Sequence, residues 1–396
     1  MKFITIIFFC IIIISACGKK QTSSTVIIPI DESDTSTWVT ANPDFYKEKL
    51  SKGINLSNWF NDYSDMNQYT NRFSNINFKQ LKDLGFKHVR LPIAWELLYN
   101  ISDPSTLNPQ NITFIDDALK KITASGLSVI LDAIHGGKEN VETSLATDES
   151  YSINIMAYWK AIVKRYRYQY SPEQLFFEIL NEPHVNPNNI NSDIWWPPVQ
   201  EKLAKAIRSV SKNHFIIVGG GVYNSIYGLK KIKPYAITNL VYNFHFYDKL
   251  EFTHQGATWV GSLIAKLSGI PYPSSPEIVK PVIDSSNDPE EKTFLLNYGQ
   301  EKWNINKIDS IIKEAADWAS QNSIAYITCN EFGSYKLVSP RQSRLNWVND
   351  TRTVLEKYKI GWSMWEYDEG FGLVDYNNGL RNNPIVDIQL IKSLGL

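Results

Sequence analysis

The 396-residue sequence has few cysteines, almost no net charge and no recognisable metal-binding spacing. A formal net charge of −1 at pH 7 argues against a nucleic-acid partner, which would require a basic surface. Of the three cysteines, Cys10 and Cys17 fall in the N-terminal leader described below, so only Cys329 remains and no internal disulfide is expected. The HExxH and CxxC spacings are absent, and we predict neither a catalytic metal nor another cofactor.

Long hydrophobic runs are also scarce. The run Phe3–Ile14 follows Lys2 and is too short to span a bilayer comfortably, as in a signal peptide. Ile14-Ser15-Ala16-Cys17 resembles a bacterial lipobox, which predicts a signal peptide over 1–16, an acylated Cys17 and a polar, flexible tether over 17–41. The protein would then be an exported bacterial lipoprotein, anchored by its acyl groups at the cell surface or in the periplasm. The alternative is an ordinary signal peptide with a coincidental Cys17.

From about Asn42 onward, short β-branched runs alternate with amphipathic stretches, the pattern of a parallel sheet with crossover helices. Most strand starts are about 30 to 50 residues apart, the length of a βα unit. This predicts an α/β protein in which residues 42–396 form a single (β/α)₈ TIM barrel. The eight expected strands are Lys52–Leu56, Lys87–Leu91, Ser128–Ala133, Leu175–Leu180, Phe215–Val218, Leu240–Phe246, Ile324–Asn330 and Ile360–Trp365.

Between these strands the spacing predicts helices, two of which stop at Gly85 and Gly126. The expected helices are Phe78–Leu84, Phe114–Ser125, Ile153–Tyr170, Gln200–Ser211 and Lys307–Gln321. One interval is much longer than the others, and its segment Asp248–Asn304 contains several prolines and aromatics. We interpret this insertion as a long irregular loop on the active-site face.

Reactive groups of such barrels sit at the carboxyl ends of the strands. Read in order, those ends carry Arg90, His135, Asn181-Glu182, His245-Phe246-Tyr247, Glu331 and Trp365. Two glutamates among these groups suit acetal hydrolysis, because one acid must protonate the leaving oxygen while an ionised carboxylate attacks or stabilises the oxocarbenium-like centre. Arg90 would favour the charged form of a nearby carboxylate, and apolar walls would favour the neutral form of the other. Asn181 is placed to hydrogen-bond a sugar 2-hydroxyl.

Aromatic residues are abundant, with 12 Trp and 21 Tyr, and a surplus suits a cleft in which pyranose rings stack on aromatic faces. We interpret Trp195 and Trp196, in the expected loop after strand four, and Trp59, after strand one, as sugar-stacking residues. His184 is either an exposed loop residue or a sugar contact. Glu178, inside strand four, is expected to point into a barrel layer or a salt bridge.

These residues resemble glycoside hydrolase family 5, the cellulase family of clan A. The resemblance runs from about Lys52 to Trp365 and rests on strings in barrel order: Lys52–Leu56, Arg90-Leu91-Pro92, Glu178–Pro183, His245-Phe246-Tyr247 and Asn330–Gly333. It implies a retaining mechanism with Glu182 as acid/base and Glu331 as nucleophile, their carboxyl groups about 5 to 5.5 Å apart.

The resemblance also implies roles for the neighbouring residues. Tyr247 would hydrogen-bond the nucleophile and Trp365 would form the floor of the sugar subsite before the cut bond, while Arg90, His135, Asn181 and His245 would complete the site. Two features depart from the family pattern. Many members carry a His pair where this chain has His135-Gly136-Gly137, and the segment Phe252–Trp259 has no counterpart in the common pattern.

The implied function is endo-acting hydrolysis of a β-1,4-linked glucan by a monomeric enzyme. A β-mannanase or xyloglucanase on the same scaffold is the alternative within the enzyme class. A surface glycan-binding lipoprotein that has lost hydrolysis, and a transglycosylase that passes the sugar to another acceptor, are the alternatives of other kinds.

Overall fold

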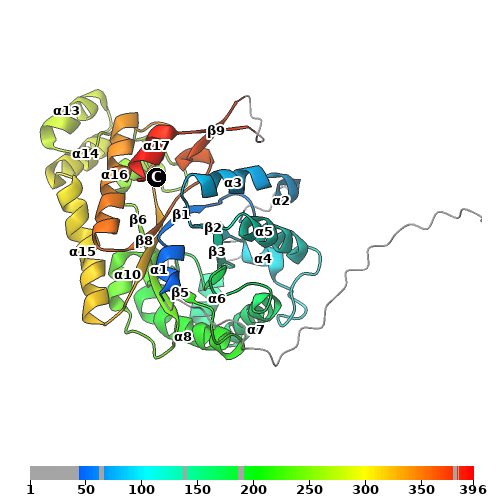
Figure 1. Cartoon of the computed structure of the whole chain (residues 1–396). Coiled ribbons are helices and arrows are strands. Elements are labelled where there is room, and N and C mark those ends of the chain that lie inside the picture. Colours follow the sequence, from blue (N-terminus) through cyan, green and yellow to red (C-terminus); the bar gives the residue numbers. More distant parts are fainter. Residues whose placement is uncertain (1–43, 62–66, 137–140, 186–190, 378–380, 382) are drawn as a thin grey trace, which may run out of the picture. The chain divides into compact units, whose positions relative to one another are not determined.

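The computed structural model describes residues 44–61, 67–136, 141–185, 191–377, 381 and 383–396 (Figure 1). The predicted signal peptide 1–16, Cys17 and the tether 17–41 lie outside the described residues, as does Gly137. Within the described part of the chain, no helix combines the length and apolar character needed to cross a bilayer.

Eight parallel strands pair in chain order, and β1 closes the barrel against β8. The predicted (β/α)₈ barrel is therefore confirmed, and each predicted strand is found with small shifts at its ends. Figure 1 shows the strands at the centre with helices around them. The strands are β1 Lys52–Asn55, β2 His88–Pro92, β3 Ser128–Asp132, β4 Leu175–Glu178, β5 Ile216–Gly219, β6 Leu240–Phe246, β7 Ile327–Phe332 and β8 Gly361–Met364.

The outer helices pack on apolar side chains that point outward from the strands, such as Val89, Phe177 and Trp362. All five predicted helices are present, and Gly85 (φ +101°) and Gly126 (φ +83°) follow the ends of two of them in a conformation that favours glycine. The helices up to β6 are α1 Phe45–Lys49, α2 Asn67–Asn71, α3 Asn75–Asp83, α4 Trp95–Leu98, α5 Ile112–Ala124, α6 Val141–Thr147, α7 Glu149–Tyr166, α8 Ser192–Val210, α9 Gly221–Asn224 and α10 Ile226–Lys231.

The amino-terminal end of the barrel is closed by apolar residues. Tyr46 of α1 stacks on Phe215 with ring centroids 4.4 Å apart, and Ile217 and Val241 fill the interior beneath them. Above this plug the interior becomes polar. His88, the first residue of β2, lies lower, 2.9 Å from the carbonyl of Lys49 in α1, and fits because Gly53 has no side chain: a Cβ at position 53 would lie 2.0 Å from His88 Nε2. The barrel is thus solid up to its carboxyl end, and chemistry is confined to that end.

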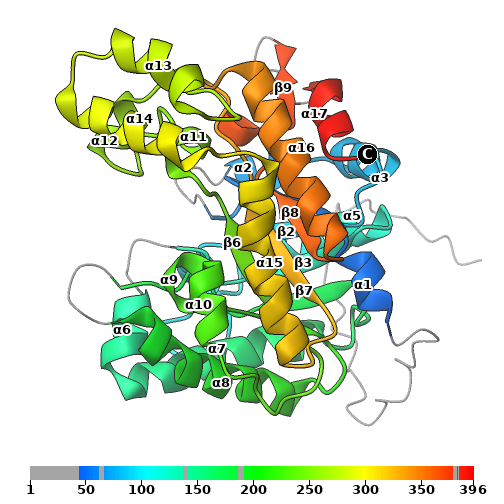
Figure 2. The same cartoon turned by 90° about the vertical axis from the view of Figure 1, so that its left-hand side faces the viewer.

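The insertion after β6 is mostly helical, so the predicted irregular loop over Asp248–Asn304 is wrong. Two of its prolines, Pro276 and Pro289, are the first residues of helices capped by Ser275 and Asp288. Proline is favoured at that position because its missing N–H has no helical partner there. Figure 2 shows these helices grouped together above α15. They are α11 Leu250–Thr253, α12 Ser262–Lys266, α13 Pro276–Ser285 and α14 Pro289–Glu301.

The carboxyl-terminal part completes the barrel and adds elements that the sequence did not predict. Helices α15 and α16 lie side by side in Figure 2 and pack on each other. Beyond β8, a short antiparallel pair and a last helix follow. These elements are α15 Ile305–Gln321, α16 Arg341–Lys357, the 3₁₀ turn η1 Glu369–Phe371, β9 Val374–Tyr376, β10 Pro384–Val386 and α17 Ile388–Ser393.

Candidate active site

The predicted site residues from six strands converge at the carboxyl end of the barrel, called the rim below. The ring of His135, which follows β3, lies nearly parallel to that of Trp365, which follows β8, with centroids 5.6 Å apart and planes at 9°. Glu182, which follows β4, and Glu331 of β7 approach each other across His245 of β6. The rim therefore holds two carboxylates close together beside a pair of ring faces.

Glu331 faces the interior because of a bulge in β7. Strand alternation would place Glu331 on the same side as Cys329, which packs in the outer core. The pairing shifts instead: Phe244 lies opposite Cys329, but His245 lies opposite Glu331, which leaves Asn330 as an extra residue. A bulge of this kind re-aims the side chain that follows it. Asn330 and Glu331 consequently both turn inward, since Asn330 Nδ2 also donates to Glu178 inside the barrel.

Both oxygens of Glu331 accept hydrogen bonds. Arg90 Nη1 donates to Oε1 at 2.6 Å, and the hydroxyl of Tyr247 donates to Oε2 at 2.9 Å. Burial and the charge of Glu331 raise the pKa of Tyr247 well above its ordinary value, so this hydroxyl stays protonated and remains a donor. A carboxylate that accepts from a guanidinium on one side and from a phenol on the other is fixed in position.

Glu182 lies in a different environment. Its backbone φ of +43° is in the left-handed region, which is uncommon for a residue with a side chain and is found mainly at functional sites. Burial raises the pKa of its carboxyl, although the nearby His135 and Arg90 oppose the shift. Its Oε1 lies 2.8 Å from His245 Nδ1. The two glutamates thus have the different surroundings that an acid and a nucleophile need: burial raises the pKa of Glu182, whereas a guanidinium and a phenol donate to Glu331.

His245 connects the two carboxylates. Its Nδ1 is 2.8 Å from Glu182 and 3.6 Å from Glu331, and one ligand atom from each of the three residues lies within 4.8 Å of the others. Burial lowers the pKa of His245 to about 4, so the ring is neutral at neutral pH. These three groups have a spacing that a metal ion would accept. A cation there would face the guanidinium of Arg90, which already binds Glu331, so the donor set suits proton transfer better than metal binding.

Arg90 organises the polar layer beneath the rim. It is fully buried, and neighbouring carboxylates keep its pKa well above the ordinary value although burial opposes the charge. Glu178 binds it at 2.8 Å, which confirms the expected salt bridge, and burial raises the pKa of Glu178 to about 7 while Arg90 opposes that rise. The side chains that accept hydrogen bonds from Arg90 are Asn55, Asp132, Glu178, Asn181 and Glu331.

Asp132 is a site residue that the sequence analysis missed. It accepts a hydrogen bond from His135 Nδ1 at 2.7 Å and another from Arg90 at 2.9 Å. The first bond fixes the tautomer and orientation of His135, the ring that faces Trp365. A signal was present in the sequence, because Asp132 ends an otherwise apolar strand at an inward position, as Glu178 does.

A group of aromatic residues from three loops was also missed. Below we call His254, Trp259, Tyr335 and Phe371 the rim aromatics. His254 lies edge-on to Tyr247 with centroids 4.9 Å apart, and Trp259 lies edge-on to Tyr335 at 5.2 Å. Trp259 is 61% exposed, an unusual state for so large an apolar ring. The segment that carries it, Phe252–Trp259, is the one that fitted no common pattern.

Two predicted sugar-stacking residues are core residues instead. Trp59 is 1% exposed, stacks on Phe60 at 4.4 Å and donates Nε1 to the carbonyl of Tyr69. Trp196 is equally buried and donates Nε1 to the carbonyl of Gly219. Neither ring has a free face, so the predictions for Trp59 and Trp196 are wrong.

The prediction for Trp196 failed because its segment is a helix. Residues 195–198 belong to α8 rather than to a loop, and the side chain of Asn191 caps the helix by accepting from the N–H of Asp193. The adjacent prolines, Pro197 and Pro198, obscured that start. Trp195 also lies on α8, half-buried and edge-on to Trp196 at 5.5 Å.

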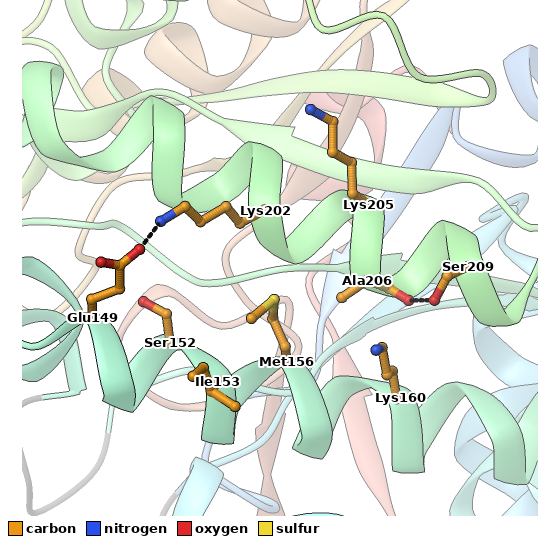
Figure 3. A pocket seen from close by; sticks show the side chains of 9 residues that line it. All are labelled: Glu149, Ser152, Ile153, Met156, Lys160, Lys202, Lys205, Ala206 and Ser209. Carbon is orange, nitrogen blue, oxygen red and sulfur yellow. Dashed lines mark hydrogen bonds and ion pairs between the residues drawn. The ribbon is translucent and has the colours of Figure 1, made fainter.

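A groove of about 490 Å³ lies elsewhere, between α7 and α8 (Figure 3). Figure 3 shows Lys202 paired with Glu149 across it, at 2.8 Å. Its lining contains none of the rim residues, so we assign it no part in the chemistry.

Comparisons with known proteins agree with this geometry. A family model described as cellulase, glycosyl hydrolase family 5, matches residues 42–370. Endoglucanase 3 of Fibrobacter succinogenes is 29% identical over 367 residues, which are 88% of this chain and 54% of that protein. The chain thus spans about half the length of this relative. Endoglucanase C of Acetivibrio thermocellus is 27% identical over 80% of this chain and 90% of its own length.

Solved structures give the same result. Thermotoga maritima Cel5A in complex with cellobiose, in a mutant form, superposes with a TM-score of 0.69 at 27% identity, covering 88% of this chain and 98% of that one. The same protein in complex with mannotriose gives a TM-score of 0.68 at 28% identity, with 88% and 99% coverage.

Proposed function

The chain belongs to the cellulase family, glycosyl hydrolase family 5, and from that premise we propose that it is a retaining endo-β-1,4-glucanase. One observation carries the mechanism: Glu182 and Glu331 each place a carboxylate oxygen within 4.8 Å of the other. Retaining enzymes need their carboxyl groups about 5 to 5.5 Å apart, whereas inverting enzymes need about 6.5 to 9.5 Å to fit a water. The short separation is too small for the water that an inverting enzyme places there, and it favours direct attack by one carboxylate.

In the first step, Glu331 attacks the anomeric carbon and the bond to the glycosidic oxygen breaks. Arg90 and Tyr247 hold the attacking carboxylate. Glu182 gives its proton to the leaving oxygen, a role that suits a carboxyl whose pKa is raised by burial. The products of the step are a glycosyl ester on Glu331 and a released chain end.

In the second step, Glu182 acts as a base. It removes a proton from a water that attacks the same carbon, and the ester bond to Glu331 breaks. His245, which is neutral at neutral pH, lies 2.8 Å from Glu182 and holds this carboxyl in place. The sugar leaves with its original anomeric configuration and the enzyme is restored.

The sugar on the non-reducing side of the cut bond has a defined place. Trp365 offers a ring face there, supported by His135 and Asp132. Asn181, whose Oδ1 accepts from Arg90 at 2.8 Å, keeps its amide N–H free to point toward the sugar 2-hydroxyl. The exposed Trp259 extends the aromatic surface along the rim, as a long polymer substrate requires.

A β-1,4-mannan is the second candidate substrate. The observation that favours it is that Thermotoga maritima Cel5A, whose barrel this chain resembles along 88% of its length, has been solved with both cellobiose and mannotriose. Mannose differs from glucose in its axial 2-hydroxyl, which would meet Asn181.

Export and lipid anchoring remain part of the proposal. Ile14-Ser15-Ala16-Cys17 supports cleavage before Cys17 and acylation of that residue, and the anchored enzyme would act as a monomer. Mass spectrometry of the mature amino terminus from the producing cell tests the first point. A diacylglyceryl-Cys17 is expected, and an unmodified terminus at another residue would refute anchoring.

The function is tested by reducing-end release from carboxymethyl-cellulose, mixed-linkage glucan, xyloglucan, glucomannan and xylan, with the full chain beside Glu331→Gln. We expect release from a β-1,4-glucan that disappears in the variant. Release from mannan-containing substrates alone would favour the second candidate. Folded protein that releases nothing from any of them, yet binds glucans, would refute hydrolysis in favour of a glycan-binding role.

A further inference from the structure

The hydroxyl of Thr253, the last residue of α11, takes no part in the chemistry described above, but it makes a short hydrogen bond to a residue that does. Thr253 Oγ1 donates to the backbone carbonyl of Tyr247 at 2.6 Å. The phenol of Tyr247 in turn donates to the nucleophile Glu331 at 2.9 Å. Thr253 is 0% exposed, so bulk water does not compete for its bond.

This bond differs from the one that a helical threonine usually makes. Such a hydroxyl commonly donates to the carbonyl four residues earlier, which here belongs to Lys249 and lies 3.3 Å away. The carbonyl of Tyr247, six residues earlier, is nearer. Because a hydroxyl has a single proton, the nearer carbonyl receives it. The hydroxyl of Thr253 therefore holds the chain at the end of β6 and not its own helix.

The neighbouring histidine is consistent with this direction. His254 Nδ1 lies 3.0 Å from Thr253 Oγ1, and burial lowers the pKa of His254 to about 4, so its ring is neutral at neutral pH. Since the hydroxyl proton points to Tyr247, Oγ1 is left as an acceptor, and Nδ1 carries the hydrogen of the ring. His254 thus donates to Thr253, which donates to Tyr247.

The surroundings of Thr253 fix its position. Its carbonyl accepts from the N–H of Tyr335, in the loop after β7, at 2.8 Å. Gln255, two residues further on and fully buried, donates to the carbonyl of Phe252 at 3.0 Å and accepts from the N–H of Ile270 at 2.8 Å. Helix α11 also packs on α14 (Figure 2). A hydroxyl held by both the insertion and the β7 loop can set the position of the group that it contacts.

Tyr247 needs such support because of its place in the chain. It lies one residue beyond the end of β6 at Phe246, so the sheet itself does not fix its backbone. A shift of that backbone is carried through the ring to the hydroxyl that contacts Glu331. Displacement of a catalytic group by about 1 Å can lower the rate about 100-fold.

We propose that Thr253 is a positioning residue for the hydrolytic reaction: its hydroxyl holds the backbone of Tyr247 so that the phenol stays on Glu331. The insertion after β6 then contributes to the first step through its first helix, by a residue that acts on the nucleophile through Tyr247. This inference rests on the proposed function and adds a residue to its machinery.

The test measures kcat/KM of the full chain on 2,4-dinitrophenyl β-cellobioside, whose leaving group needs no proton, so that the assay reports attack by Glu331. Thr253→Val removes the hydroxyl and nearly keeps the shape, and kcat/KM should fall about tenfold or more. Thr253→Ser keeps the donor and should stay within about threefold of the parent. Equal losses in these two variants would overturn the proposal, because the hydroxyl would then not be responsible. Thr253→Ala replaces Thr253→Val if that chain does not fold.

A double-mutant cycle separates positioning from a general effect on the fold. Tyr247→Phe removes the hydrogen bond to Glu331, so adding Thr253→Val to it should lower kcat/KM by less than about twofold further. A merely structural role would lower kcat/KM by the same factor in both backgrounds. That result, or a Thr253→Val chain with the kcat/KM of the parent, would overturn the proposal.

Thr351→Val is the matched control. Thr351 is also 0% exposed, but its Oγ1 has no hydrogen-bond partner among the residues that the structure describes. Its substitution removes a buried hydroxyl of the same kind and should leave kcat/KM unchanged. If the parent chain cleaves neither glucan nor the aryl cellobioside, the proposed function fails and the positioning role fails with it. An active parent beside an equally active Thr253→Val refutes the positioning role alone.

Discussion

Replacement of Arg90 by methionine should destabilise the barrel far more than loss of an ordinary ion pair. Arg90 is 0% exposed and binds Asp132, Glu178 and Glu331 directly. Removing one partner of a buried ion pair costs about 3 to 5 kcal/mol, because the remaining charge has no compensation. At about 2 °C for each kcal/mol in a large domain, Tm should fall by roughly 6 to 10 °C.

The loss should depend on pH, and its direction follows from Glu178. Its folded pKa of about 7 lies above the ordinary 4.5, so its burial favours the protonated form. That contribution to stability is fully present below about pH 4.5 and is lost as the pH rises through the folded pKa. Arg90 lowers the folded pKa of Glu178, so this pKa should be higher in Arg90→Met than in the parent. The pH range over which deprotonation of Glu178 costs stability then extends further upward. The Tm deficit of Arg90→Met should therefore be larger at pH 8 than at pH 5.

Thermal unfolding followed by circular dichroism at both pH values measures this effect. Arg165→Met is the matched control, because Arg165 also binds a carboxylate through Nε and Nη2, that of Asp116, but is one-third exposed. Exposed pairs contribute about 0 to 1 kcal/mol, so its Tm should change by about 2 °C or less. Equal Tm values for Arg90→Met and the parent, or a deficit that does not vary with pH, would refute the reasoning.

Three further predictions concern the rim and the core beneath it. Glu182→Gln should lower kcat/KM on glucan by about 10²- to 10⁴-fold, the usual contribution of a general acid. The first step on a dinitrophenyl glycoside, measured by burst kinetics, should lose much less, because its leaving group needs no proton. Equal losses on the two substrates would contradict the assignment of Glu182 as the acid. Because burial raises the pKa of Glu182, kcat/KM of the parent should fall as pH rises through that pKa, and this basic limb should be missing from the pH profile of Glu182→Gln. Trp59→Ala should lose about 3 to 5 kcal/mol of stability, measured by denaturant unfolding, because its ring is buried. Trp259→Ala should raise KM for glucan with little change in Tm, because its ring is exposed. The reverse pattern would show that the core and rim assignments are exchanged.

Strand alternation and the position of polar residues at strand ends were enough to predict the barrel and most of the rim. Runs such as Val129–Leu131 are apolar on both faces because helices cover one side and the interior plug the other, and this makes parallel strands easy to recognise. Arg90, Glu182, His245 and Glu331 stand out because each is a polar residue within or shortly after such a run. The family resemblance then gave these positions their expected roles.

The errors arose where local signals have two meanings. Pro289 marks a break in sequence but begins a helix, and only the cap formed by Asp288 distinguishes the two cases. Trp59 and Trp259 are the same residue type near the same rim, yet one is buried by Phe60 and the other is exposed. Burial depends on neighbours that are distant in sequence, so one sequence without a fold cannot separate them.

The single extra residue in β7 has a consequence for anyone who transplants this site. A designer who copies Glu331, His245 and Arg90 onto an idealised barrel with regular strands would reproduce every reactive group and still point the nucleophile at the helices. Deletion of Asn330 from the natural chain would not have this effect, because Glu331 would then follow the outward-facing Cys329 directly and still alternate inward; only a strand that keeps Asn330 but loses the bulge turns Glu331 outward. The activity is therefore encoded partly in the bulge of a strand, a property that no catalogue of catalytic side chains records.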